Sequence, residues 1–101
     1  MANTSKFLAR GTLETAEAAL YTVPASTKAL VKKITLCNKT ATAATATIEF
    51  GDIKIIGGAS IAANESVDYS PNHILDAADT IDGLAGTATA IDYYISGIEI
   101  T

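Results

Sequence analysis

The stretch Ala29-Leu30-Val31-Lys32-Lys33-Ile34-Thr35-Leu36-Cys37-Asn38 is the strongest strand signal in the sequence. β-Branched and aliphatic residues dominate it, and such side chains suit a pleated surface. Because side chains alternate across a strand, Lys32 shares a face with Ile34 and the two leucines, whereas Lys33 lies on the opposite face. An ammonium group on an apolar face must reach solvent or pair with an acid. We therefore expect Lys32 to lie at a sheet edge or an interface.

The segment that follows this strand also alternates. Residues 43–50 carry apolar side chains on one face and polar ones on the other, with Ala44, Ala46, Ile48 and Phe50 expected inward and Thr45, Thr47 and Glu49 outward. Turn-forming residues occupy positions 39–42 between the two strands. The spacing predicts that the two strands form a hairpin.

Turn residues divide the rest of the chain into pieces of strand length. Further strands are expected at residues 6–13, 20–23, 53–55, 60–62, 66–70 and 87–101. Residues 72–83 are expected to form a corner in which Ile74 and Leu75 are buried. In the last strand the apolar residues fall on odd positions up to Ile95 and on even positions after it. A bulge at Gly97, which adds one residue, would keep the same face apolar throughout.

Seven or eight strands without intervening helices predict an all-β fold, an antiparallel two-sheet β-sandwich of jelly-roll-like topology. The 101 residues include 19 Ala, 14 Thr and 12 Ile, and a chain of this length suits one domain. With 49% hydrophobic and 18% charged residues the chain is too apolar for disorder. It also lacks the run of about 20 apolar residues that crosses a membrane. The sequence predicts a soluble globular protein.

Charge is distributed unevenly along the chain. The formal net charge is −4, yet all seven cations lie in residues 1–54, which sum to +3, while residues 55–101 carry seven acids and no cation. Nucleic acid is not expected as a partner, because a phosphate-binding surface needs a basic excess. If the halves formed different faces, copies could stack positive onto negative. No signal-peptide core is found near the start, so synthesis in the cytoplasm without secretion is expected.

A single Cys and a single His leave few means for catalysis. His73 has no second histidine or nearby cysteine to complete a nucleophilic set, so it is interpreted as a loop or interface residue, with catalysis or metal ligation as the alternative. A cupin-type enzyme would need several His ligands. Cys37 is expected to be reduced and buried. We expect neither enzymatic activity nor a bound cofactor.

Three acids recur at every third position of the expected corner, at Asp76, Asp79 and Asp82. Calcium prefers such oxygen ligands, but the loop of an EF-hand spaces its ligands at every second residue. Aspartates also cap turns, which explains the same positions without an ion, and calcium stays the alternative. The pair Tyr93-Tyr94 directs one ring to each face, so one ring is expected in the core and the other exposed as a contact residue.

Five segments in a fixed order carry a family resemblance. They are Leu20-Tyr21-Thr22-Val23-Pro24-Ala25, Ala29 to Asn38, Ala59-Ser60-Ile61-Ala62-Ala63-Asn64-Glu65, Ile74-Leu75-Asp76-Ala77-Ala78-Asp79-Thr80-Ile81 and Ile95-Ser96-Gly97-Ile98-Glu99-Ile100-Thr101. Over residues 18–101 this order resembles the small β-sandwich structural proteins of tailed bacteriophage virions, which include capsid decoration, neck and tail components. The resemblance implies a non-enzymatic virion protein, a trimer or hexamer that binds itself and other virion proteins such as capsid or tail subunits.

The resemblance also divides the chain into a sandwich domain at 18–101 and a less well matched segment at 1–17, which is an arm or a first strand. The interface candidates are Lys6, Phe7, Arg10, Lys32, Lys33, His73, Asp76, Asp79 and Tyr94. The alternative function is a carbohydrate- or receptor-binding module on a phage tail or cell surface. That alternative predicts a cleft lined by Tyr69, Tyr93 or Tyr94.

Overall fold

The computed structural model describes residues 3–101, and Met1 and Ala2, which begin the expected 1–17 segment, lie outside the described residues. Residues 3–101 form nine strands: β1 (Asn3–Thr12), β2 (Ala18–Thr22), β3 (Lys28–Asn38), β4 (Ala44–Phe50), β5 (Ile53–Ile61), β6 (Ser66–Tyr69), β7 (His73–Leu75), β8 (Thr80–Ala85) and β9 (Ile91–Ile100). Within that range there is no helix long and apolar enough to cross a bilayer.

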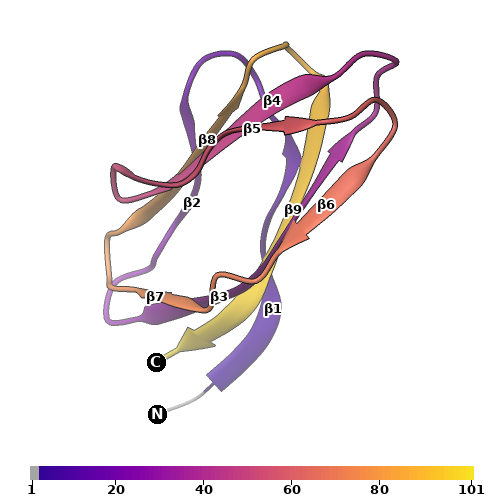
Figure 1. Ribbon diagram of the computed structural model, residues 1–101. Helices are drawn as coiled ribbons and strands as arrows, with labels where there is room; N and C mark the ends of the chain where they lie inside the picture. The colour runs from indigo at the N-terminus through magenta and orange to yellow at the C-terminus, as the bar shows by residue number, and fades with distance from the viewer. Residues whose placement is uncertain (1–2) are drawn as a thin grey trace.

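Two antiparallel sheets pack on each other (Figure 1). Sheet A has the order β1-β9-β3-β6, with β7 also paired to β3, and sheet B has the order β2-β8-β4-β5. The chain crosses between the sheets after most strands, which produces the two Greek keys of a jelly roll. Strands β6 and β7 pair with different parts of β3 and so occupy one position in sheet A. The predicted all-β sandwich is confirmed. Residues 72–83, expected as one corner, instead contain β7 and the start of β8, while the strands expected at 53–55 and 60–62 join as β5, so the count is nine.

Aliphatic side chains between the sheets form the core. Ile34, Leu36 and Ile95 of sheet A and Ile48 and Ile81 of sheet B are fully buried. Removing a side chain of this size from water contributes about 1.5–3 kcal/mol, so these residues are a main source of stability. The predicted inward face of β4 is confirmed, since its four alternate apolar residues from position 44 to position 50 are buried.

Glu49 is buried although the sequence pattern places it outward. In the register of sheet B it lies between Asp82 on β8 and Lys54 on β5, on the side away from the core. Its neighbours leave it only 8% exposed, and its Oε2 lies 3.8 Å from the Lys54 ammonium nitrogen. The side to which Glu49 points was therefore predicted correctly, and its burial comes from neighbouring side chains on the same face of sheet B.

The predicted hairpin between β3 and β4 is wrong, because these strands belong to different sheets. Residues 39–43 form a crossover, which the buried Asn38 organises. The Asn38 amide nitrogen donates to the carbonyls of Thr42 at 2.8 Å and Ile61 at 3.0 Å, and its Oδ1 accepts from the Thr40 amide at 2.9 Å. The hairpin partner of β4 is instead β5, joined through Gly51 and Asp52.

That tight turn has the backbone geometry that a two-residue hairpin requires. Gly51 and Asp52 have φ angles of 53° and 67°, and Phe50 pairs with Ile53 across them. Positive φ at both central residues matches the right-handed twist of the flanking strands. Strand β5 then continues through Gly57 and Gly58, so the two short strands expected at 53–55 and 60–62 are one.

The bulge expected at Gly97 lies on the neighbouring strands instead. The extra residue on β1 is Leu8, opposite the Ile95–Ser96 step of β9, and the extra residue on β3 is Lys32, opposite the Ser96–Gly97 step. Gly97 is required for another reason: a Cβ built there would lie 2.1 Å from the carbonyl oxygen of Leu30. The glycine therefore permits the close backbone approach that the bulge on β3 creates.

The bulge on β3 changes which of its side chains face the core. Val31 and Ile34, which were expected on opposite faces, are both fully buried, and Lys32 and Lys33 are both exposed. The expectation that Lys32 shares the face of Ile34 is therefore wrong. Ile74, expected to be buried, is 61% exposed, because β7 pairs with the end of β3 and turns this side chain away from the core.

Candidate interaction surfaces

The outer face of sheet A, the side turned away from sheet B, carries an aromatic–cationic group made of Phe7, Arg10 and Tyr94. The ring centroids of Phe7 and Tyr94 are 5.8 Å apart, and Arg10 Cζ lies 4.8 Å from the Phe7 centroid. Phe7 and Tyr94 are 43% and 45% exposed. Positions three apart on a regular strand point to opposite sides, so Phe7 and Arg10 share a face only because of the bulge at Leu8.

Polar side chains continue this face across the sheet. Tyr94 pairs with Thr35 on β3, and Thr35 pairs with Asp68 on β6. The Thr35 hydroxyl donates to Asp68 at 2.7 Å, and Lys33 Nζ lies 3.5 Å from the other Asp68 oxygen. The hydrogen bond from Thr35, followed by the charge of Lys33, lowers the pKa of Asp68. Lys32 extends from the same region and is exposed.

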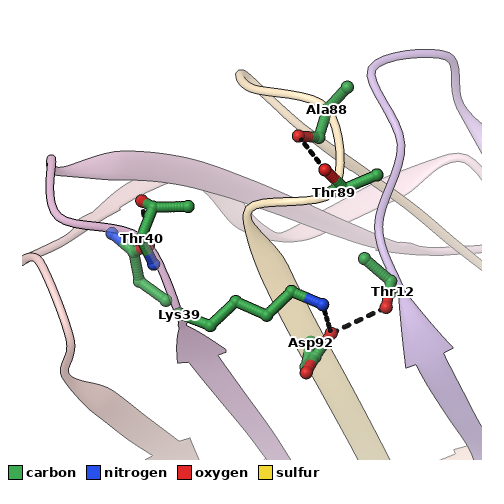
Figure 2. A network of polar contacts seen from close by, with 7 residues as sticks. Thr12, Lys39, Thr40, Ala88, Thr89 and Asp92 are labelled. Carbon is green, nitrogen blue, oxygen red and sulfur yellow. Dashed lines mark hydrogen bonds and ion pairs between the residues drawn. The ribbon is translucent and has the colours of Figure 1, made fainter.

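A second polar group lies near the crossover end of this face (Figure 2). Asp92 Oδ1 accepts a 2.7 Å hydrogen bond from Thr12 and lies 2.9 Å from Lys39 Nζ. Figure 2 shows that the three side chains come from β1, the crossover after β3, and β9. Hydrogen bonds from Thr12 and then from Lys39 lower the pKa of Asp92. The group ties three chain segments together at the surface.

An apolar row crosses the other end of the same face. Leu30 on β3 pairs with Ile74 on β7 and with Ile98 on β9. Ile74 is exposed, and the other two side chains are half-buried. Directly paired side chains lie on the same side of a sheet, so the three residues form one continuous apolar strip.

The outer face of sheet B is acidic. Glu49 pairs in register with Asp82 and Lys54, and Glu17 and Asp52 approach from the adjoining loops. Carboxylate oxygens of Glu17, Asp52 and Asp82 lie within 4.8 Å of one another. Desolvation and then the nearby charges of Glu49, Asp82 and Asp52 raise the pKa of Glu17. Sequence reasoning did not find this cluster, because its members come from separate segments.

Four predicted interface residues lie away from the aromatic–cationic group. Lys6 lies on the inner side of sheet A, with its Nζ 3.5 Å from Glu99 Oε1. His73 on β7 is exposed, and its ring meets Phe50 edge-on with centroids 6.2 Å apart. Asp76 lies 2.6 Å from Lys28, and Asp79 accepts a 3.0 Å hydrogen bond from the Asp76 amide.

These contacts show that the acids of the 76–79 turn have structural partners. Asp82, which the calcium alternative grouped with Asp76 and Asp79, lies instead in the acidic cluster on sheet B. An open pocket of about 450 Å³ lies beside the turn; its lining residues are Ser26, Thr27, Lys28, Asp76, Ala77, Ile100 and Thr101.

The tyrosine cleft expected for a sugar-binding module is not formed. Tyr93 and Tyr94 face opposite sides of β9, as predicted, and Tyr93 packs against the core together with Tyr69. Desolvation raises the pKa of Tyr93. Only Tyr94 of the three rings is exposed on the outer face of sheet A. Cys37, expected to be buried, is half-buried and carries a free thiol.

Comparisons with known proteins identify the fold. No family model and no curated protein matches the chain. Among solved structures, the chain is similar to the Bacillus endospore appendages, which form a novel family of disulfide-linked pili, with a TM-score of 0.53, 20% identity, and coverage of 99% of this chain and 87% of that one. It also matches the Agl-KA catalytic domain at a TM-score of 0.46 and 13% identity, over 90% of this chain and 20% of that one. At 20% identity the likeness to the appendage protein is one of fold alone.

Proposed function

We propose that this chain is a non-enzymatic structural subunit that assembles with further copies of itself. The observation that carries the proposal is the aromatic–cationic group, in which Phe7, Arg10 and Tyr94 contact one another yet remain open to solvent. Aromatic side chains and arginine are enriched at the centre of protein interfaces. An exposed set of this kind on a sheet is typical of a contact surface.

The energetics of covering this group are favourable. Each aromatic side chain can bury roughly 150–250 Å², and somewhat less than half of each ring is exposed here. At about 25 cal/mol per Å², covering both rings would contribute on the order of 4 kcal/mol. The rings and the guanidinium already pack together on a hydrogen-bonded sheet, so little side-chain freedom is lost on docking.

The similarity to the Bacillus endospore appendages supports the proposal only through the fold, because one fold hosts many functions. It indicates that a jelly roll of this size can serve in a self-assembling fibre. Covalent linkage is a different matter. A disulfide-linked polymer needs at least two half-cystines per subunit, and these 101 residues contain one cysteine. We therefore propose non-covalent assembly.

The finer proposal places the subunit in the virion of a tailed bacteriophage, as a capsid decoration, neck or tail component. It is supported by the order of segments over residues 18–101 described above. On this proposal the protein is made in the host cytoplasm, forms a trimer or hexamer, and contacts capsid or tail subunits without binding nucleic acid or membrane.

The test compares Tyr94→Ala with Tyr94→Phe by light scattering and native mass spectrometry. We expect the wild type to be oligomeric, Tyr94→Ala to shift at least tenfold toward monomer, and Tyr94→Phe, which keeps the ring, to assemble normally. A wild type that stays monomeric at high concentration contradicts the proposal. Electron microscopy of the assembled form then separates the contexts: closed trimers or hexamers support the virion, and open fibres support a pilus-like role.

A further inference from the structure

We propose that the outer face of sheet A docks onto the acidic outer face of sheet B of a second copy, so that subunits add head to tail. The inference rests on the proposed function and adds to it the partner surface and the direction of assembly. Its evidence is the charge, apolar content and placement of the two faces.

The outer face of sheet A is positive around its aromatic group. Arg10, Lys32 and Lys33 are exposed there, and Asp68, paired with Lys33, is the acid beside them. These four side chains sum to +2. Lys32 reaches the outer side because it is the extra residue of the β3 bulge, on a strand that has paired neighbours on both sides.

The outer face of sheet B is negative. Glu17, Glu49, Asp52 and Asp82 gather around Lys54, and these five side chains sum to −3. Mutual repulsion of carboxylates this close is unfavourable, and after desolvation it is the second cause that raises the pKa of Glu17. A cationic surface brought against the cluster would relieve this repulsion, so the face is complementary to the Arg10, Lys32 and Lys33 region of another copy.

The two faces lie on opposite sides of the molecule, because the outer sides of packed sheets point away from each other (Figure 1). A two-fold contact would bring like charges together on either face. Joining the outer face of sheet A (face A) to the outer face of sheet B (face B) is a heterologous contact, which closes into a ring or continues as a fibre. Each sheet contains strands from both the cationic first half and the acidic second half of the sequence. The separation of positive and negative side chains onto different faces therefore comes from strand register and bulges rather than from chain order.

The size of the faces suits a specific contact. The molecule extends 46 × 21 × 17 Å along its principal axes. A standard interface buries about 800 Å² on each partner, so a contact of that size would cover a large part of one side of a molecule of these dimensions. The contact would then include the aromatic–cationic group and the half-buried apolar strip of Leu30, Ile74 and Ile98.

The experiment blocks one face at a time. Variant one carries Arg10→Glu and Lys32→Glu on face A, and variant two carries Glu17→Lys and Asp52→Asn on face B. Asn is chosen at position 52 because it tolerates the positive φ of that turn. At a concentration where the wild type assembles, each variant alone should be monomeric. An equimolar mixture should form a 1:1 dimer and nothing larger, since each variant retains one intact, complementary face.

Glu65→Lys, a charge reversal in the exposed turn between β5 and β6, is the matched control and should assemble as the wild type does. Assembly of the wild type should weaken at least tenfold between 0.1 M and 1 M NaCl, where the screening length falls from about 10 Å to 3 Å. If both variants assemble normally, or if their folded mixture stays monomeric, the head-to-tail contact is wrong while self-assembly stands. A wild type that never assembles overturns both proposals.

Discussion

The Tyr21 hydroxyl donates a 2.5 Å hydrogen bond to Glu99 Oε2, which joins β2 of sheet B to β9 of sheet A. Lys6 Nζ lies 3.5 Å from the other oxygen of Glu99. The carboxylate therefore links three strands at the end of the sandwich where β1 begins and β9 ends (Figure 1). Burial and then the hydrogen bond to Glu99 raise the pKa of Tyr21 far above its ordinary value.

Replacing Tyr21 by Phe should destabilise the fold by about 1–2 kcal/mol. A hydrogen bond to a charged group contributes about 1.5–3 kcal/mol, and partial exposure of this site reduces the figure. Urea unfolding followed by circular dichroism measures the change. Tyr94→Phe removes a hydroxyl from the exposed outer face and is the control, with an expected change below about 0.5 kcal/mol. Equal effects from the two variants would mean that the bond between the sheets does not stabilise the fold.

Gly97→Ala should cost about 3 kcal/mol or more. The added methyl group would overlap the Leu30 carbonyl oxygen, a backbone atom that moves only if β3 and β9 separate. Thermal and urea unfolding give the loss. Gly57→Ala serves as the control, because its Cβ would meet only Lys54 Cδ at 3.8 Å, and it should change stability by less than about 1 kcal/mol. A Gly97→Ala protein as stable as the wild type would falsify the close approach at the bulge.

Asn38→Ala should lower stability by about 2–4 kcal/mol. It removes the acceptor of the Thr40 amide and leaves the carbonyls of Thr42 and Ile61 without this donor, in a site where Asn38 is fully buried. Unsatisfied buried polar groups cost about 1–3 kcal/mol each. Thr42→Ala is the control, because it keeps the backbone carbonyl that Asn38 uses and should be nearly neutral. Hydrogen exchange should also show faster opening of residues 39–43 in Asn38→Ala.

Asp92→Asn should make stability less dependent on pH in the acid range. The pKa of Asp92 is lower in the folded protein, so its ionised form contributes stability above the unfolded value of about 3.9, and this is lost as the pH falls through the folded value. The variant should be less stable than the wild type at pH 6, by less than about 1 kcal/mol because the pair is half-exposed. Unfolding curves at pH 6 and pH 2.5 test this, and a gap that does not shrink at pH 2.5 would contradict it.

Sequence reasoning and structure agree most closely on individual strands. The strand at 43–50 and its inward face followed directly from side-chain alternation, which is a local property of any extended chain. The exposure of Tyr94 opposite the half-buried Tyr93 followed from the same rule. The prediction weakened where one strand met another, as with Ile74, whose exposure depends on where β7 pairs along β3.

The candidate surfaces depended on tertiary structure to a greater degree. Phe7, Arg10, Lys33 and Tyr94 were named from the sequence, but no residue pattern showed that three of them would contact one another. That contact needs the bulge at Leu8, which exists only in register with β9. The acidic cluster was missed altogether because Glu17 and Asp82 are 65 positions apart in the sequence.

The sequence by itself determined that the chain is an all-β protein and where most of its strands lie, because turn residues and the two-residue period act over a few neighbours; β7 and β8 were not among the expected strands. Only the tertiary structure decided that β3 and β4 belong to different sheets, that Lys32 and Lys33 both face solvent, and that opposite charges gather on opposite faces. Those features depend on backbone hydrogen bonds between distant strands, and a single extra residue in such a ladder changes the side of the sheet to which the following side chains point.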